Sequence, residues 1–191
     1  MSMKIVVLDG YNAKGEELNF DFLKKYGEVA YYDRTAPEDV LNRIVDADIV
    51  LLNKVVLTRE IMAQCKKLKF VSILATGYNV VDVKAARDLG ITVSNVPYYS
   101  TASVAQLAFA FILEFASRVA THDESVHRGV WQNSEDFAYT VGTLHELYGK
   151  TLGIIGYGSI GKRVAQIGKA FGMNLLIHNR TPFECSVSRE E

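Results

Sequence analysis

The chain has 191 residues, of which 49% are hydrophobic and 23% are charged, a composition typical of a globular protein that buries a sizeable core in one or two domains. Its formal net charge is −1 and it contains no basic run, which argues against nucleic acid or an anionic membrane surface as a partner. Cys65 and Cys185 lack the spacing of a metal site or a redox motif, so we expect thiols in a reducing cytoplasm and no bound metal. No signal peptide or membrane-spanning stretch is evident, which predicts a cytoplasmic protein.

The first hundred residues alternate between short apolar runs and segments of helical spacing. We expect strands at residues 4–8, 28–32, 48–52, 69–74 and 91–94. We expect helices at 18–25, after Thr35, at 58–63 and at 82–89. The strands are near-continuous runs of Val, Ile and Leu, which is typical of a parallel sheet covered on both faces. The pattern predicts a flavodoxin-like α/β domain over residues 1–98, with loops 53–55 and 75–79 at the carboxyl ends of strands, where such sheets bind ligands.

The longest apolar helical stretch is residues 100–118. It is hydrophobic almost all round, so we expect it to be buried on most sides. It is either an interdomain or intersubunit helix or the core helix of one domain. The intersubunit alternative predicts a homodimer formed through this helix. Residues 123–149 show little periodicity and predict a short helix and a loop.

A glycine motif then follows a strand and opens a helix. Residues 152–155 are an apolar run, Gly156, Gly158 and Gly161 follow at G-x-G-x-x-G spacing, and residues 162–170 have helical character. Gly156 permits the tight turn, Gly158 lets bare backbone approach a diphosphate, and Gly161 lets the helix lie close to the strand. The alternative is an ordinary glycine-rich turn, but the strand–turn–helix context favours a dinucleotide site. Residues 99–191 are therefore predicted to be the N-terminal part of an incomplete Rossmann (doubly wound) NAD(P)-binding domain.

Four stretches together resemble one enzyme family. They are Ile73–Asp82, Val93–Pro97, Ser100–Gln106 and Leu152–Gly161. In order and spacing they are similar to the D-isomer-specific 2-hydroxyacid dehydrogenases, with the members that interconvert hydroxypyruvate and D-glycerate the most similar. The resemblance covers nearly the whole chain. It implies hydride transfer between NAD(P)H and a small 2-oxo or 2-hydroxy acid, in a cleft between a substrate domain and a Rossmann domain.

The same resemblance implies roles for individual residues. Thr76 and Gly77 would present backbone N–H groups to the substrate carboxylate, and Asn79 would hold that loop or line the cleft. From the residues alone, Thr76-Gly77 is an ordinary turn at a strand end. Thr101 and Val104 would lie near the nicotinamide ring. The diphosphate would be bound by Gly156, Tyr157, Gly158, Ser159, Ile160 and Gly161.

The residues after the second Rossmann strand bear on cofactor choice. In family members that use NAD, an Asp at the end of this strand binds the ribose hydroxyls. Here the strand 174–178 is followed by Asn179 and Arg180. This pair removes the repulsion of a 2′-phosphate and offers donors and a cation, which favours NADP(H) or the use of both cofactors. Alternatively, Arg180 is a solvated loop charge.

The family's catalytic Arg, Glu and His lie later than the last residue of this sequence. His122, His127, His145 and His178 lack a carboxylate at a recognisable spacing, so we assign none as a catalytic residue and expect negligible turnover by this chain alone. The last strand would carry an open edge and an uncovered apolar face at residues 175–177, followed by a polar tail over 184–191. Two other functions stay open: a non-catalytic dinucleotide-binding module, as in corepressors of this fold, and a fragment that only dimerises.

Overall fold

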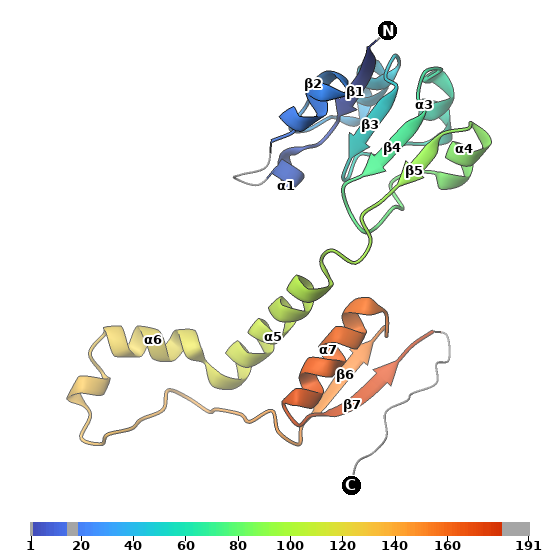
Figure 1. The fold of residues 1–191 in the computed structure, drawn as a ribbon. Helices are drawn as coiled ribbons and strands as arrows, with labels where there is room; N and C mark the ends of the chain where they lie inside the picture. Colours follow the sequence, from blue (N-terminus) through green and yellow to red (C-terminus); the bar gives the residue numbers. More distant parts are fainter. Residues whose placement is uncertain (1, 15–18, 181–191) are drawn as a thin grey trace. The chain divides into compact units, whose positions relative to one another are not determined.

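The computed structural model describes residues 2–14 and 19–180 (Figure 1). The chain divides into two compact units, Met1–Tyr99 and Ser100–Glu191, here called the first and the second unit. The predicted polar tail and Cys185 lie outside the described residues.

The first unit is built on a parallel five-stranded sheet. Its strands are β1 (Met3–Val7), β2 (Gly27–Tyr31), β3 (Ile49–Leu52), β4 (Phe70–Ile73) and β5 (Thr92–Ser94). Their order is β2-β1-β3-β4-β5, and every neighbouring pair is parallel. This is the flavodoxin-like order, so the predicted fold of this unit is confirmed. The strand order reverses direction between β1 and β3. Because these strands are parallel, their carboxyl ends lie at the same end of the sheet.

Short helices connect these strands. They are α1 (Tyr11–Lys14), a 3₁₀ turn (Asp21–Lys25), a 3₁₀ turn (Pro37–Asp39), α2 (Val40–Ile44), α3 (Arg59–Gln64) and α4 (Val83–Asp88). Thr58 and Asp82 cap α3 and α4 by accepting hydrogen bonds from Ile61 N and Ala85 N. The helix predicted after Thr35 is confirmed: it begins at Pro37 as a 3₁₀ turn and continues as α2, although Thr35 does not cap it, because its hydroxyl donates to the Leu8 carbonyl.

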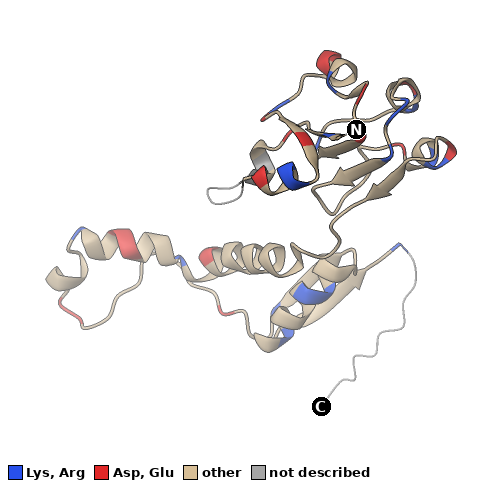
Figure 2. Cartoon of the chain, turned by 45° about the horizontal axis from the view of Figure 1, so that its top comes forward, with Lys and Arg blue, Asp and Glu red and all other residues tan. Residues whose placement is uncertain are grey.

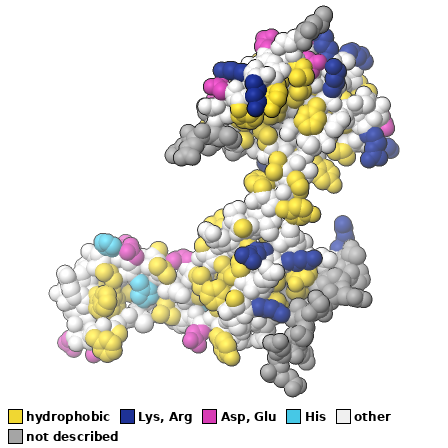
Figure 3. Space-filling model, in the orientation of Figure 1, with side chains coloured by type: hydrophobic (Ala, Val, Ile, Leu, Met, Phe, Trp, Pro, Cys, Tyr) yellow, Lys and Arg dark blue, Asp and Glu magenta, His cyan; other side chains and the backbone are white. Residues whose placement is uncertain are grey.

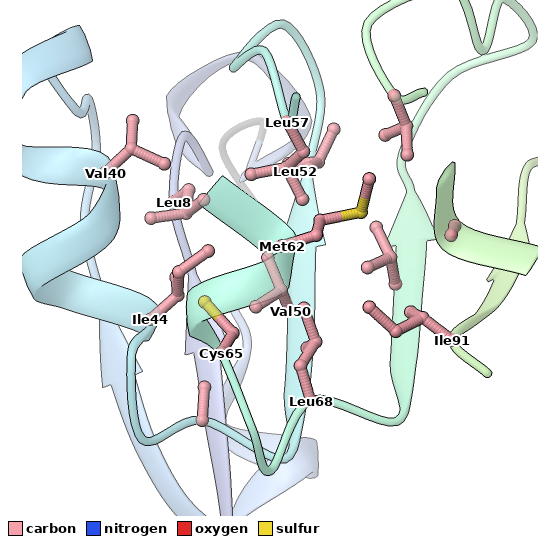
Figure 4. Packing of buried hydrophobic residues seen from close by; sticks show 14 of the residues in the cluster. Leu8, Val40, Ile44, Val50, Leu52, Leu57, Met62, Cys65, Leu68 and Ile91 are labelled. Carbon is pink, nitrogen blue, oxygen red and sulfur yellow. The ribbon is translucent and has the colours of Figure 1, made fainter. Parts of the chain in front are cut away.

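Apolar side chains cover both faces of the sheet. Val6, Leu8, Val50 and Leu52 point into one cluster, which α2, α3 and α4 complete (Figure 4). Alternate residues of the same strands, Ile5, Val7 and Leu51, belong to a second cluster with Phe20 and Leu23. The pleat explains this division, since successive strand residues point to opposite faces. Cys65 is a free thiol within the first cluster, and burial raises its pKa, so it is a packing residue rather than a nucleophile.

The second unit holds one βαβ unit and a helical arm. Its elements are α5 (Thr101–Ser117), α6 (Val119–His127), a 3₁₀ turn (Trp131–Asn133), β6 (Thr151–Ile155), α7 (Ser159–Ala170) and β7 (Asn174–His178). β6 and β7 pair in parallel, and α5 packs along α7, where the Phe109 and Phe171 rings stack at 5.5 Å. Arg118, in the left-handed region at φ 51°, separates α5 from α6.

Within the single chain, α5 is buried on one side, and burial of its other sides by another domain or subunit stays a prediction. Leu107, Phe111 and Phe115 are exposed, Phe115 by 83%, while α5 packs mainly against α7. Hydrophobic side chains are visible on the surface of the second unit in Figure 3. Leu176 of β7 is 67% exposed. No single helix of the described residues is long and apolar enough to cross a membrane; α5 and α6 reach the required length and composition only together, across a bend of 58°.

Candidate functional site

The glycine corner, residues 156–161, joins β6 to α7. Gly156 has φ +94°, a conformation that side chains other than glycine rarely adopt. A Cβ atom on Gly161 would lie 2.1 Å from the Gly156 carbonyl oxygen, so the first turn of α7 packs directly against the end of β6. Both glycines are therefore required by the local backbone, as the motif predicts.

Gly158 differs from the other two glycines of the motif, Gly156 and Gly161. A Cβ atom there would meet nothing within 4 Å, and its φ of −77° is open to any residue, so the fold itself does not demand a glycine. Gly158 is the N-cap of α7 and supplies no side-chain hydrogen bond to the helix end. The N–H groups of the first turn, residues 159–161, are those that a helix leaves without an internal acceptor. Bare backbone, open space and an uncapped helix N-terminus are what a dinucleotide diphosphate requires.

The end of β7 lies beside this corner. The Gly156 N–H donates to the His178 carbonyl at 2.8 Å, and the Tyr157 N–H donates to Asn179 Oδ1 at 3.3 Å. Arg180 follows and is exposed. Basic residues also mark the first half of α7, where Lys162 and Arg163 are exposed (Figure 2). The surroundings of the glycine corner therefore favour an anion.

The loop 75–79 follows β4 in the first unit. Thr76 Oγ1 donates to the Val96 carbonyl at 3.1 Å, and Asn95 Nδ2 donates to the Thr76 carbonyl at 2.8 Å. The residues from Thr76 to Asn79 are exposed, and the closest atom to a Cβ added at Gly77 would be Asn79 Oδ1 at 3.4 Å. The loop is thus fixed by the segment after β5 while its backbone stays open to a ligand. Thr76, Gly77 and Asn79 lie together, as the resemblance implies.

Thr101 and Val104 lie in the first turn of α5, in the second unit. Thr101 is half-buried and Val104 is exposed. The predicted substrate residues thus lie in one unit and the predicted cofactor residues in the other.

Asp9 is an important residue that the sequence analysis missed. It follows β1, is only 9% exposed, and accepts hydrogen bonds from three successive N–H groups: Asn53 at 2.6 Å, Lys54 at 2.5 Å and Val55 at 3.2 Å. Its carboxylate therefore fixes the loop 53–55 that follows β3. The signal was present in the sequence as an acidic residue directly after a buried strand, at the edge of the sheet where ligands bind.

The histidines have structural or surface positions. The Val141 N–H donates to His122 Nε2 at 3.0 Å, so Nδ1 carries the proton that is donated to the Arg118 carbonyl at 2.8 Å. The expectation that no histidine has a carboxylate neighbour is wrong for His127, whose Nδ1 lies 3.4 Å from Asp123 Oδ1 one helical turn away. This pair is exposed on α6.

The parallel sheet of the first unit and the glycine corner of the second together define an α/β protein of the doubly wound parallel class. Residues 5–165 match the family described as D-isomer specific 2-hydroxyacid dehydrogenase, catalytic domain. The chain is 47% identical over 180 residues to a hydroxypyruvate reductase of Blautia hydrogenotrophica, covering 93% of this chain and 56% of that protein. It is 33% identical to a glycerate dehydrogenase of Methylorubrum extorquens, covering 100% of this chain and 60% of that protein.

A solved structure shares the fold. It is an NADPH-dependent glyoxylate/hydroxypyruvate reductase from Sinorhizobium meliloti in complex with NADP and malonate, with a TM-score of 0.73 and 27% identity over 96% of this chain and 55% of that one. The chain belongs to the D-isomer specific 2-hydroxyacid dehydrogenase family. It spans 56% of the length of the Blautia protein and 60% of the Methylorubrum protein.

Proposed function

We propose that this chain supplies two positioning parts of an NAD(P)-dependent D-2-hydroxyacid dehydrogenase that interconverts hydroxypyruvate and D-glycerate. The observation that carries the proposal is the glycine corner, where Gly161 is required by packing while Gly158 keeps open space at a helix N-terminus. A bound nicotinamide cofactor would supply the hydride. The residues of this chain would bind and orient the two reactants, which lowers the entropic part of the barrier.

The substrate would be held by its carboxylate. The backbone N–H groups of Thr76 and Gly77 lie in an exposed loop that the 95–96 segment holds in place, which suits anion binding by backbone amides. Asn79 completes the loop beside Gly77. The choice of hydroxypyruvate and glycerate is supported by the names of the Blautia and Methylorubrum proteins, and the malonate of the Sinorhizobium structure is likewise a small carboxylate.

The cofactor would be NADP(H), or either cofactor, rather than NAD(H) alone. Asn179 ties the end of β7 to the glycine corner without a negative charge, and Arg180 follows it. A 2′-phosphate is favoured by a nearby cation and disfavoured by a carboxylate. The NADP of the Sinorhizobium structure supports this choice. Thr101 and Val104 would lie near the nicotinamide.

The proton donor would not come from this chain. His122 uses both ring nitrogens in backbone hydrogen bonds, and His127 pairs with Asp123 on the surface of α6. We therefore propose negligible hydroxypyruvate reduction by residues 1–191 alone. The exposed Leu107, Phe111 and Phe115 on α5 support a homodimer formed through this helix. A cytoplasmic location and the absence of nucleic-acid or membrane partners stay predictions.

Calorimetric titration of the purified chain with NADPH and with NADH tests whether the glycine corner binds a dinucleotide. Gly158→Ala fits the fold but fills the open space, so it should weaken dinucleotide binding by about tenfold or more while the melting temperature stays unchanged. Gly153→Ala is the matched control, because its added Cβ also meets nothing within 4 Å but lies within β6. Equal dinucleotide binding by both variants would contradict the proposed site. Efficient turnover by the unmodified chain would contradict the proposed inactivity and leave the dinucleotide site standing.

A further inference from the structure

A pocket lies in the first unit, away from the loop 75–79. It has a volume of about 500 Å³ and is lined by residues that follow β1, β2 and β3, from Asp9 to Ile61. Neither the loop 75–79 nor its partner segment 95–96 contributes to the lining. The pocket therefore sits at the carboxyl ends of β1 and β3, between which the strand order reverses. This is the position where parallel α/β sheets form a crevice for ligands, and the volume is in the range of small-molecule sites.

The floor of this switch-point pocket is apolar and continuous with the core. Val40 is 2% exposed and belongs to the main hydrophobic cluster, against which Val55 and Ile61 pack (Figure 4, where Val40 is labelled). Asp9 also lines the pocket, but three backbone N–H groups already occupy its carboxylate. The same three bonds fix the loop that carries Lys54 and Val55. The floor and this wall are therefore preformed.

The rim of the pocket carries two cations. The Arg34 guanidinium lies 4.1 Å from the centroid of the Tyr11 ring, and the exposed Lys54 side chain lies on the loop fixed by Asp9. Within the described part of the chain, the Lys54 ammonium has no ion-pair or hydrogen-bond partner. Two carboxylates share the lining: Asp9, which accepts three backbone N–H groups, and Asp33, which accepts a hydrogen bond from the Tyr31 hydroxyl at 2.9 Å. The rim thus offers an aromatic face and two cations, while both carboxylates of the lining already accept hydrogen bonds.

We propose that the switch-point pocket binds a small monocarboxylate with an apolar body, either aromatic or branched. The apolar part would lie on Val40, Val55 and Ile61, and the carboxylate would reach Arg34 and Lys54. Charge-assisted hydrogen bonds of this kind give direction to a contact whose area is mainly apolar. The proposal does not rest on the proposed dehydrogenase function, because no residue of the glycine corner or of the loop 75–79 takes part.

The test uses the whole chain and 3-phenylpropionate as the probe, with amide shifts recorded by two-dimensional NMR. Saturable shifts should appear at Arg34 and at residues 54–56. The alcohol 3-phenylpropanol lacks the charge and acetate lacks the apolar body, so each should bind about tenfold or more weakly. Arg34→Gln and Lys54→Gln should each weaken binding by about three- to tenfold, a loss in the range of single charged contacts. Lys84→Gln, an exposed lysine on α4, is the matched control and should change nothing.

A further variant tests the location of the probe even if Arg34→Gln and Lys54→Gln each have a small effect. Val56 lines the pocket and is 55% exposed, so Val56→Asp should fold normally while placing a like charge beside the probe carboxylate. Binding should then be lost. Three results would overturn the proposal: no saturable shift at about 10 mM probe, shifts centred on residues 76–79, or displacement of the probe by hydroxypyruvate.

Discussion

The two units of this chain contain apolar runs that look alike in sequence but are buried to different degrees. In β1, Ile5, Val6 and Val7 are at most 1% exposed. In β6, Ile154 is 8% exposed but Ile155 is 90% exposed. The difference follows from the layers around each strand. β1 pairs on both sides and carries apolar clusters on both faces, whereas β6 pairs with β7 alone among the residues that the structure describes. A run of apolar residues predicts a strand, and the number of its neighbours decides how far the strand is buried.

The loops of the two units differ in the same way. In the first unit, side chains hold the loops: Asp9 holds residues 53–55, and Asn95 and Thr76 hold residues 75–79. In the second unit, the glycine corner is shaped mainly by backbone, through Gly156 and Gly161. Substitutions should therefore affect the first unit through lost side-chain contacts and the second unit through added atoms.

The largest contrast is expected between a buried leucine of the first unit and an exposed leucine of the second. Leu52 is fully buried, so Leu52→Ala should lower the unfolding free energy of the first unit by about 2–5 kcal/mol. Leu176→Ala, at a mostly exposed position of β7, should change stability by less than about 0.5 kcal/mol. Far-UV circular dichroism in urea follows both units, and fluorescence of the one tryptophan, Trp131, follows the second. Similar losses for the two variants would refute the difference in burial.

The next effect concerns the carboxylate that holds loop 53–55. Asp9→Ala leaves three backbone N–H groups without their acceptor and should cost about 2–3 kcal/mol in unfolding free energy. Hydrogen exchange at residues 53–55 should accelerate more than elsewhere in the first unit. Asp88→Ala is the control, because Asp88 only forms an exposed ion pair with Arg59 and should cost less than about 1 kcal/mol. Unchanged exchange at loop 53–55 in Asp9→Ala would show that the loop does not depend on Asp9.

In the second unit, an added methyl group should be more harmful than a lost one. Gly161→Ala places a Cβ 2.1 Å from the Gly156 carbonyl oxygen, so the start of α7 must shift, at a cost of about 1–3 kcal/mol. Gly153→Ala adds the same atom where nothing lies within 4 Å and should be close to neutral. Thermal unfolding followed by Trp131 fluorescence compares the two variants. Equal melting temperatures for Gly161→Ala and Gly153→Ala would contradict the close packing of β6 against α7.

The sequence predicted the strands of the first unit well, because each apolar run finds two faces to bury. Prediction from sequence failed where the role of a side chain depends on a partner distant in the sequence. The Thr35 hydroxyl, just before a predicted helix, donates to Leu8, 27 residues away, and Asp9 binds a loop 44 to 46 residues away. Such pairs depend on strand order, which local spacing does not contain. The exposure of α5 is a similar case, since apolar character reveals a contact surface but not its partner.

The predicted site divides along the same line. The glycine corner could be recognised from sequence because its requirements are local: a strand, a turn with φ > 0 at Gly156 and a close approach at Gly161. The loop 75–79 could be recognised only by resemblance, because its shape depends on bonds from residues 95 and 96. The switch-point pocket had a sequence signal only in part, through loop 53–55 and Asp9 after two strands, because its full lining is assembled from the ends of three strands.

The smallest effect tests Asn179, a side chain that ties the end of β7 to the glycine corner. Asn179 Oδ1 accepts a hydrogen bond from the Tyr157 N–H, and an Asp at this position keeps that acceptor. Asn179→Asp should therefore leave the fold intact while adding a negative charge near the expected 2′-phosphate. We expect the affinity ratio of NADPH to NADH to fall by about tenfold. Calorimetric titration with each cofactor measures the ratio. Arg180→Gln, which removes a cation without adding an anion, should weaken NADPH alone and by less. A ratio unchanged in both variants would show that the end of β7 does not contact the ribose phosphate, and the preference for NADP(H) would lose its basis.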